Sequence, residues 1–252
     1  MQHGAVRYLT LGDQSLIVEF GNAISPEISA KVRGMYLAVL ESGIPGIIDL
    51  NPTYRSLMVG YDPAVILYDD LVAQLKSLEN KLGEMSLPEP NILIVPTLYG
   101  GEEYGPDMKT VMETSALSQE EVISIHTGTD YLVYMLGFTP GFSYLGGMDI
   151  RIETPRLKNP RVRIPGGSVG IAGKQTGIYS IDGPGGWQLI GRTPIKIYDP
   201  YREKPILHKA GDYIRFVSID LAQYNRIDEQ VKAGRYTYQI FPIRGEQADG
   251  VH

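Results

Sequence analysis

The chain has 252 residues, a formal net charge of −6 and no cysteine. Its 43% hydrophobic and 21% charged residues are typical of a globular protein and exclude a mainly disordered one. The sequence shows no signal peptide and no run of the ~20 apolar residues that a membrane helix needs, and its acidic balance argues against a nonspecific nucleic-acid binder. The lack of cysteine excludes disulfides and thiolate nucleophiles and fits a reducing cytoplasm.

The first 88 residues are predicted to form a small α+β domain. Ser25 and Gly43 are the expected caps of the first helix, and Gly83 follows the second. Over residues 5–95 we expect strands at 6–11, 15–20, 47–53, 56–61 and 92–98 and helices at 26–42 and 68–82. This order predicts an antiparallel sheet with both helices on one face, followed by a polar, proline-containing linker at 86–90.

Residues 89–252 are predicted to form a second, mainly-β domain. Two short helices come first, at 107–115 and 118–126, and the second begins with a capping box. Short apolar runs between Gly/Pro turns follow at 131–135, 169–172, 177–181, 187–191, 195–198 and 213–217. Such regularly spaced short strands predict a closed or nearly closed β barrel. The tail after Gln247 is expected to fray.

A basic segment within the acidic chain attracts attention. Between residues 151 and 174 there is one acid, Glu153, and six basic residues: Arg151, Arg156, Lys158, Arg161, Arg163 and Lys174. Guanidinium groups pair with carboxylates or phosphates, and glycine turns let backbone N–H groups approach an anion. The segment is therefore either a site for a small anion or a solvated face whose Gly and Pro residues turn the corners of a barrel.

The glycine-rich run 166–174 does not match a phosphate-binding loop. Ser168 stands where that motif has its first glycine, and Gln175 follows the lysine where Ser or Thr is required. The chain therefore shows no nucleotide-binding motif of this kind.

The histidines and the single tryptophan leave alternatives open. His126 ends a predicted helix, where an imidazolium would complement the helix dipole, or it lines a site. His208 falls in a polar turn and is expected at the surface. Two histidines at metal-ligand spacing are absent, so no metal site is predicted. Trp187 is either a core residue or a stacking wall for a flat ligand.

Three long strings resemble one known family. They are GFTPGFSYLGG (137–147), TPR followed by PRVRIPGGSVGIAGKQTGIY within 154–179, and PGGWQLIGRTP (184–194). The family contains the B-type subunit of bacterial 5-oxoprolinase, allophanate hydrolase subunit 1 and a sporulation-kinase inhibitor. The resemblance implies a cyclophilin-like barrel after the α+β domain. It also implies an ATP-dependent enzyme that opens 5-oxo-L-proline to L-glutamate.

The resemblance further implies that the chain acts with partners. One partner is a barrel protein like the C-type subunit of that enzyme and the other a protein like its A-type subunit, and ATP is expected through the assembled enzyme. Two alternatives remain: a regulatory inhibitor of a histidine kinase, and half of a biotin-dependent carboxyltransferase or allophanate-related enzyme.

Site residues are predicted within the matching segment. The predicted catalytic residues are His126, Arg163, Lys174 and Gln175. The residues predicted to bind a small anionic substrate are Thr139, Pro140, Gly141, Phe142, Tyr144, Arg161, Pro165, Gly166, Gly167, Ser168, Thr176 and Trp187. Basic side chains would hold the anion, glycine N–H groups would donate to an oxyanion, and His126 would assist proton transfer. We expect these groups to share one concave mouth.

Overall fold

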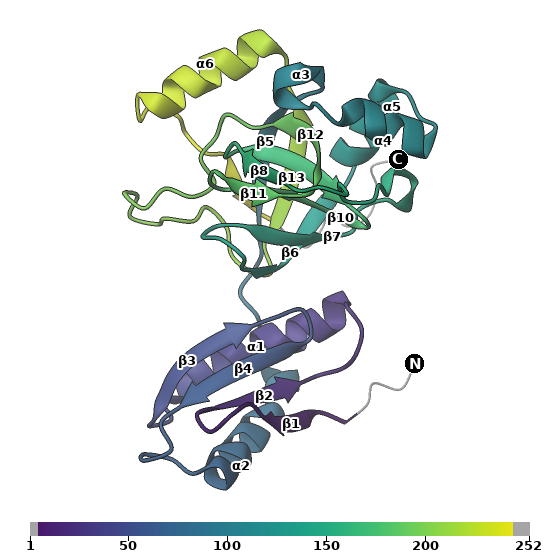
Figure 1. Ribbon diagram of the computed structural model, residues 1–252. Helices are drawn as coiled ribbons and strands as arrows, with labels where there is room; N and C mark the ends of the chain where they lie inside the picture. Colours follow the sequence, from purple (N-terminus) through teal and green to yellow (C-terminus); the bar gives the residue numbers. More distant parts are fainter. Residues whose placement is uncertain (1–4, 244–252) are drawn as a thin grey trace. The chain divides into compact units, whose positions relative to one another are not determined.

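The computed structural model describes residues 5–243 (Figure 1). The chain divides into two compact units, Met1–Pro88 and Glu89–His252. The tail predicted to fray after Gln247 lies outside the described residues. Among the helices of residues 5–243, none is long and apolar enough to cross a bilayer.

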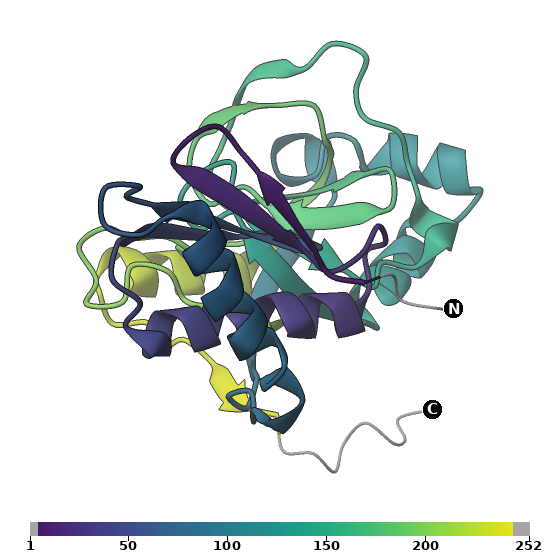
Figure 2. The same ribbon diagram turned by 90° about the horizontal axis from the view of Figure 1, so that it is seen from below.

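The first unit combines an antiparallel sheet with helices. Its elements are β1 (Arg7–Thr10), β2 (Ser15–Glu19), α1 (Pro26–Ser42), β3 (Ile47–Pro52), β4 (Ser56–Tyr61), α2 (Tyr68–Glu79) and the short 3₁₀ helix η1 (Leu82–Glu84). The strand order is β1-β2-β4-β3. Leu16 and Val18 of β2 and Leu57 and Val59 of β4 alternate along their strands and are fully buried, so they form one apolar face. Helices α1 and α2 cover this face (Figure 2), which confirms the predicted antiparallel sheet with two helices.

The ends of the first helix are as predicted, and the end of the second is not. The Ser25 hydroxyl oxygen accepts a hydrogen bond from the Ile28 N–H at 3.2 Å, and Gly43 ends α1 in the left-handed region at φ 62°. Helix α2 stops at Glu79, three residues before the predicted end. The Lys81 N–H bonds to the Leu78 carbonyl, an i→i+3 contact that tightens the chain out of α-helical geometry.

The second unit is built around an eight-stranded sheet. Its strands are β5 (Asn91–Tyr99), β6 (Asp130–Leu136), β7 (Ser143–Gly146), β9 (Ser168–Ala172), β10 (Gln175–Ile178), β12 (Gln188–Arg192), β13 (Tyr213–Ser218) and β14 (Ile240–Pro242). A separate ribbon pairs β8 (Arg161–Ile164) with β11 (Gly183–Gly185). The helices are α3 (Gly101–Tyr104), α4 (Met108–Ser115), α5 (Gln119–Thr127), α6 (Leu221–Lys232) and the 3₁₀ helix η2 (Ile150–Ile152). Strand β5, expected with the first group of elements, belongs to this sheet.

The sheet is nearly closed. Its order is β10-β9-β12-β5-β13-β6-β7, with β14 paired to β5. The two end strands, β10 and β7, lie close to each other. A Cβ atom placed on Gly177 of β10 would lie only 3.3 Å from the backbone oxygen of Ser143 in β7. The capping box of α5, with Ser118 and Glu121, is present as predicted. The prediction of a barrel-like sheet behind two short helices is therefore confirmed.

One strand predicted for this unit is wrong, and one helix was not predicted. Residues 195–198 form no strand beyond an isolated bridge between Tyr198 and Ile206. Ile195 and Ile197 are buried at alternate positions, so the run imitates a strand in sequence although it packs as irregular chain. Helix α6 was not predicted: its residues are mostly polar and none of them is fully buried, so it carries little apolar signal.

Gly105 offers a test of this packing. A Cβ atom at this position would lie 2.3 Å from the carbonyl oxygen of Ile190 in β12, the acceptor for the Gly100 N–H. We expect Gly105→Ala to lower the free energy of unfolding by about 2 kcal/mol, because backbone atoms on both sides must move. Gly83→Ala is the control, since its Cβ would meet nothing within 4 Å. Urea unfolding measures both, and equal stability of the two variants would contradict the packing described.

Candidate functional site

A hollow of about 360 Å³ in the second unit is lined mainly by aromatic and proline side chains, and we call it the aromatic cup. Its lining residues are Phe138, Phe142, Tyr144, Arg156, Leu157, Pro160, Tyr179, Pro184, Gly185, Gly186 and Trp187. Concave, largely apolar hollows of this size with a few polar groups are where small ligands usually bind. Three of the predicted substrate-binding residues are brought together here: Phe142, Tyr144 and Trp187.

Phe142 is the centre of the cup wall. Its ring centroid lies 5.6 Å from that of Trp187, 5.3 Å from Tyr144 and 5.8 Å from Tyr179, in each case edge to face. These contacts join the loop before β7 to the segments that follow β10 and precede β12. Edge-to-face pairs contribute about 0.5–1.5 kcal/mol beyond their buried area, so the wall is held in one arrangement.

Two glycines make room for these rings. A Cβ atom at Gly185 would lie 2.1 Å from the Tyr179 hydroxyl oxygen, and one at Gly177 would lie 3.0 Å from the Trp187 ring. Any larger residue would displace Tyr179 or Trp187 from the wall. Part of the glycine content of this segment is therefore explained by close approach to aromatic side chains.

Phe138 stands at the edge of the cup in an unusual backbone conformation. Its φ is +66°, its side chain is 65% exposed, and its ring lies 5.5 Å from that of Phe142. A bulky residue in the left-handed region costs free energy and is often found at a functional site. Thr139, Pro140 and Gly141 continue this loop without lining the cup; the Pro140 carbonyl accepts a hydrogen bond from Ser180 Oγ at 2.6 Å.

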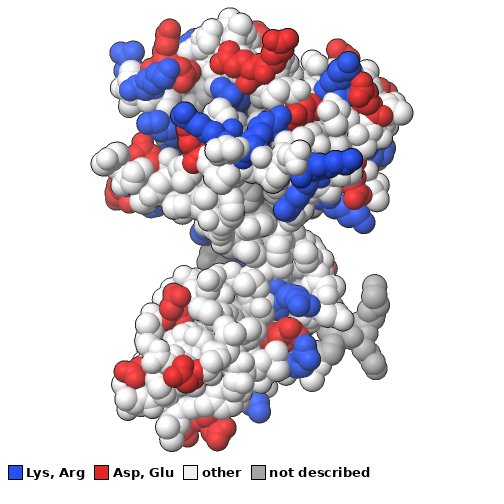
Figure 3. Space-filling view, in the orientation of Figure 1, with Lys and Arg blue, Asp and Glu red and all other residues white. Residues whose placement is uncertain are grey.

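The basic residues of the segment do not gather in one place. Arg161 Nη2 bonds to Asp107 Oδ1 at 2.7 Å, and Arg163 Nη2 bonds to Asp182 Oδ2 at 2.6 Å. Arg156 instead lines the cup, with its guanidinium carbon 6.0 Å from the centre of the Trp187 ring. On the face of the second unit drawn in Figure 3, basic and acidic side chains lie next to one another.

Gly166 and Gly167 line a different hollow, of about 450 Å³, which also contains Asp182. The Gly166 N–H donates to Asp182 Oδ1 at 2.8 Å, and the Gly167 N–H donates to the Tyr179 carbonyl at 2.6 Å. Both N–H groups predicted to hold an oxyanion are thus occupied by acceptors of the chain itself. Pro165 precedes them in the same turn.

Residues 168–178 form the hairpin of β9 and β10, with Gly173 in its turn at φ 58°. A phosphate-binding loop joins a strand to a helix, whereas a strand follows here. Ser168 is buried, and its hydroxyl has no hydrogen-bond partner among the described residues. Lys174 is exposed in the turn, and Gln175 is half-buried at the start of β10.

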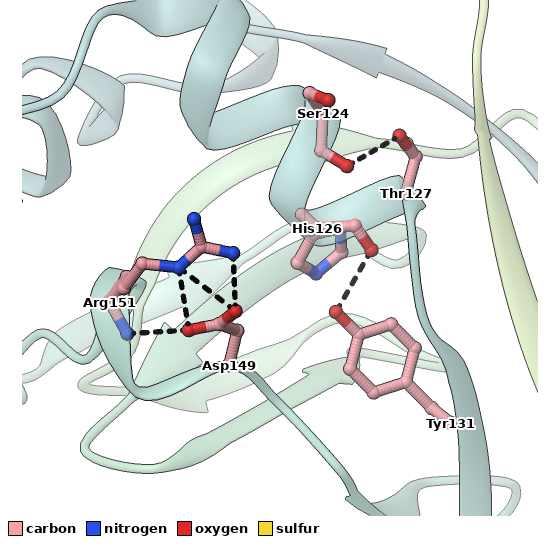
Figure 4. Close-up of polar contacts among 6 residues, drawn as sticks. All are labelled: Ser124, His126, Thr127, Tyr131, Asp149 and Arg151. Carbon is pink, nitrogen blue, oxygen red and sulfur yellow. Dashed lines mark hydrogen bonds and ion pairs between the residues drawn. The ribbon is translucent and has the colours of Figure 1, made fainter. Parts of the chain in front are cut away.

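His126 lies in the barrel interior and has no exposed surface. Tyr99 Oη lies 2.7 Å from Nδ1, and Nε2 lies 2.7 Å from Thr176 Oγ1. The Thr176 hydroxyl in turn donates to the Gly170 carbonyl at 3.1 Å. The Tyr131 hydroxyl donates to the His126 carbonyl oxygen at 2.9 Å (Figure 4).

The protonation state of His126 follows from this burial. Desolvation lowers the pKa of His126 to about 3 and raises the pKa of Tyr99 well above 10. A protonated Tyr99 therefore donates to Nδ1, and the Nε2–H donates to Thr176. The interpretation of His126 as an imidazolium at the helix end is wrong, because the ring is neutral. Both ring nitrogens belong to the interior network, and neither lines the cup.

The prediction that His208 lies at the surface is also wrong. His208 is 5% exposed, and its Nε2 forms a hydrogen bond with the Ser143 hydroxyl. Burial lowers the pKa of His208 to about 4, against the opposing charge of Asp212. The polar turn around it resembles a surface loop in sequence, but its imidazole points inward to β7.

Most residues that line the cup were not among the predicted site residues, and three of these carry an aromatic or charged side chain: Phe138, Arg156 and Tyr179. All three stand inside the strings that carry the family resemblance, which was the available signal. The described residues contain no cluster of three His, Cys, Asp or Glu side chains that could hold a metal ion.

Residues 6–208 match the family described as carboxyltransferase domain, subdomain C and D. The chain is 43% identical to the B-type subunit of 5-oxoprolinase from Bacillus subtilis over 231 residues, which is 87% of this chain and 95% of the relative. The family match covers all residues of the aromatic cup.

Two solved structures are also similar. The protein TTHA0988 is 35% identical with a TM-score of 0.73, over 82% of this chain and 40% of that one. The urea carboxylase of Kluyveromyces lactis is 20% identical with a TM-score of 0.72, over 93% of this chain and 24% of that one. The chain thus spans less than half of each of these two structures, and the second likeness concerns the fold alone.

The buried histidines predict a pH dependence of stability. His126 has a pKa of about 3 when folded and an ordinary value near 6.5, so below pH 6.5 the unfolded chain binds the proton first. The free energy of unfolding is therefore unaffected by protonation of His126 above that pH, and it decreases as the pH falls from 6.5 towards 3. Between pH 7 and pH 5, the free energy of unfolding should fall by about 2 kcal/mol on account of His126.

His126→Gln removes this contribution, so its free energy of unfolding should fall by about 2 kcal/mol less over the same interval. Urea unfolding at pH 7, 6 and 5 measures the difference. His208→Gln serves as a second, independent case, because His208 is also buried and neutral. A His126→Gln profile parallel to that of the unsubstituted protein would contradict the neutral, buried imidazole.

Proposed function

The chain belongs to the carboxyltransferase subdomain C and D family, and from that membership we propose that it is a subunit of an ATP-dependent 5-oxoprolinase, which opens 5-oxo-L-proline to L-glutamate. The observation that carries the proposal is the 43% identity to the B-type subunit of 5-oxoprolinase from Bacillus subtilis over 95% of that relative. The similarity extends over most of both chains, so it includes the fold and the cup together.

The chemistry of the aromatic cup supports this proposal. 5-Oxoproline is a small, nearly flat lactam ring with one carboxylate and one carbonyl oxygen. The exposed Phe138 ring and the small exposed parts of the Phe142 and Trp187 rings provide apolar surface for such a ring, and Arg156 provides a cation at the rim. A lactam carbonyl becomes more reactive when donors stabilise the negative charge that develops on its oxygen.

Partners form part of the proposal. A lactam is a poor electrophile, and ATP hydrolysis in the assembled enzyme supplies the free energy for its opening. Most of the glycine-rich run 166–174 lies in the hairpin of β9 and β10, so no step with ATP is assigned to it. We propose that a barrel protein of the C type and a protein of the A type complete the enzyme in the cytoplasm, and that the barrel of this chain is cyclophilin-like.

A carboxyltransferase half is the second candidate, because the matching family is described by that activity. It would transfer a carboxyl group from biotin to an amide or urea-like substrate. Inhibition of a histidine kinase is the third candidate and requires no turnover by the chain. Reconstitution separates the three.

In the reconstitution, the chain mixed with its two partners should release ADP only when 5-oxoproline is present, with L-glutamate as the product. The chain alone, and each mixture that lacks one of the three proteins, should release none above background. Carboxylation of urea by a biotin-loaded partner, or loss of kinase autophosphorylation with no ADP release, would favour the second or the third candidate instead.

The predicted catalytic roles of Arg163 and Gln175 are tested in the same assay. If these groups stabilise charge in the transition state, Arg163→Ala and Gln175→Ala should each lower turnover by about a hundredfold. Arg226→Ala is the control, since Arg226 is exposed on α6. Turnover of both variants at the unsubstituted rate would remove these residues from the active site.

A further inference from the structure

We propose that the aromatic cup binds a small planar ring that carries a carboxylate, and that Arg156 is the residue that pairs with this carboxylate. The identification of this ligand as 5-oxoproline rests on the proposed function. The site and the class of ligand rest on the contacts of the cup itself. Arg161, Arg163 and Lys174, which the sequence predicts to hold an anion, do not line this cup.

Arg156 is an exposed cation whose hydrogen-bonding capacity is unused. Within residues 5–243 its guanidinium has no hydrogen bond and no ion pair, and it lies 6.0 Å from the centre of the Trp187 ring. Arg161 differs, because Asp107 already neutralises it. A guanidinium presents a planar fork that matches a carboxylate with two parallel hydrogen bonds. Arg156 therefore has both the charge and the free donors that a ligand carboxylate requires.

Tyr179 supplies a second polar group beside it. Its hydroxyl lies against Gly185, where a Cβ atom would be 2.1 Å away. Burial raises the pKa of Tyr179, while a backbone hydrogen bond from Trp187 and the charges of Arg156 and Arg161 lower it in part. The phenol is thus protonated at neutral pH, and it lies close enough to Arg156 to feel its charge. We assign it as a donor to an oxygen of the ligand ring.

The walls of the cup limit the shape of the ligand. The exposed Phe138 ring and the small exposed parts of the rings packed around Phe142 line a hollow of about 360 Å³, together with Pro160 and Pro184. A flat ring can contact these surfaces, whereas an inorganic anion would leave them uncovered. The apolar walls and the Arg156 guanidinium together favour a ring that carries an anionic group. An uncharged ring or an inorganic anion would each satisfy only one of these two features.

The tryptophan provides the test. Trp187 is the only tryptophan of the chain, and it lines the cup, so its fluorescence reports directly on occupancy. Titration of the full chain with 5-oxoproline should give a saturable change in fluorescence. 2-Pyrrolidinone has the same lactam ring without the carboxylate and should bind at least about tenfold more weakly, because a charge-assisted pair is lost.

Substitutions locate the pair. Arg156→Ala should weaken 5-oxoproline binding at least about tenfold and leave 2-pyrrolidinone binding unchanged, and Arg156→Lys should fall between. Arg226→Ala is the matched control on an exposed helix and should bind like the unsubstituted chain. Arg156 is exposed, so the variant is expected to fold, and its thermal unfolding midpoint checks this.

The outcomes separate this inference from the proposed function. The inference is overturned if the chain shows no saturable change with 5-oxoproline, or if Arg156→Ala binds it within about twofold of the unsubstituted chain. Binding that depends on Arg156, together with an assembled complex that does not turn over 5-oxoproline, would support the inference and reject the function. In an active complex, the same variant should raise KM about tenfold or more.

Discussion

The carboxylate of Asp107 is the contact on which the cup wall depends. Its Oδ1 binds Arg161 of β8, and its Oδ2 accepts a hydrogen bond from the Leu189 N–H of β12 at 2.7 Å. The backbone N–H of Asp107 donates to the Leu189 carbonyl. Asp107 is 7% exposed, so removing Arg161 would leave a buried charge without its partner, at a cost of several kcal/mol. The Arg161 guanidinium also reaches the Trp187 carbonyl at 3.4 Å, which fixes the backbone that carries the tryptophan.

This contact gives two neighbouring arginines different roles. The charge of Arg161 is matched within the chain, and its geometry is fixed by Asp107 and Trp187. Arg156 lies over the same tryptophan without a carboxylate partner among residues 5–243, so its positive charge is available to a ligand. Position in the sequence does not distinguish them, since both follow a proline in the same basic segment. The ion pair with Asp107 distinguishes them, and Asp107 lies 54 residues from Arg161 in the sequence.

Local signals in the sequence were sufficient for much of the fold. The Ser25 and Gly43 caps and the Ser118 capping box act within a few residues and are present, and so are the predicted short apolar strands other than the one at 195–198. The strand predicted at 195–198 is absent although Ile195 and Ile197 are buried at alternate positions, and helix α6 was missed because its residues are mostly polar and none is fully buried. For the site, the sequence correctly grouped Phe142, Tyr144 and Trp187. The expected single basic mouth is absent because Arg161 and Arg163 form ion pairs with residues far away in the sequence, and the spacing of the basic residues cannot reveal such pairs.

The barrel interior and the cup divide the polar chemistry of the second unit. Inside, His126 is neutral and its two ring nitrogens are held by Tyr99 and Thr176, so it stabilises the fold. At the cup, Arg156 and Tyr179 are both hydrogen-bond donors, and donors bind anions and polarise a carbonyl oxygen. Under the proposed function, this chain therefore contributes recognition and polarisation of the lactam. A partner that brings ATP would then act on a ring already held by its carboxylate.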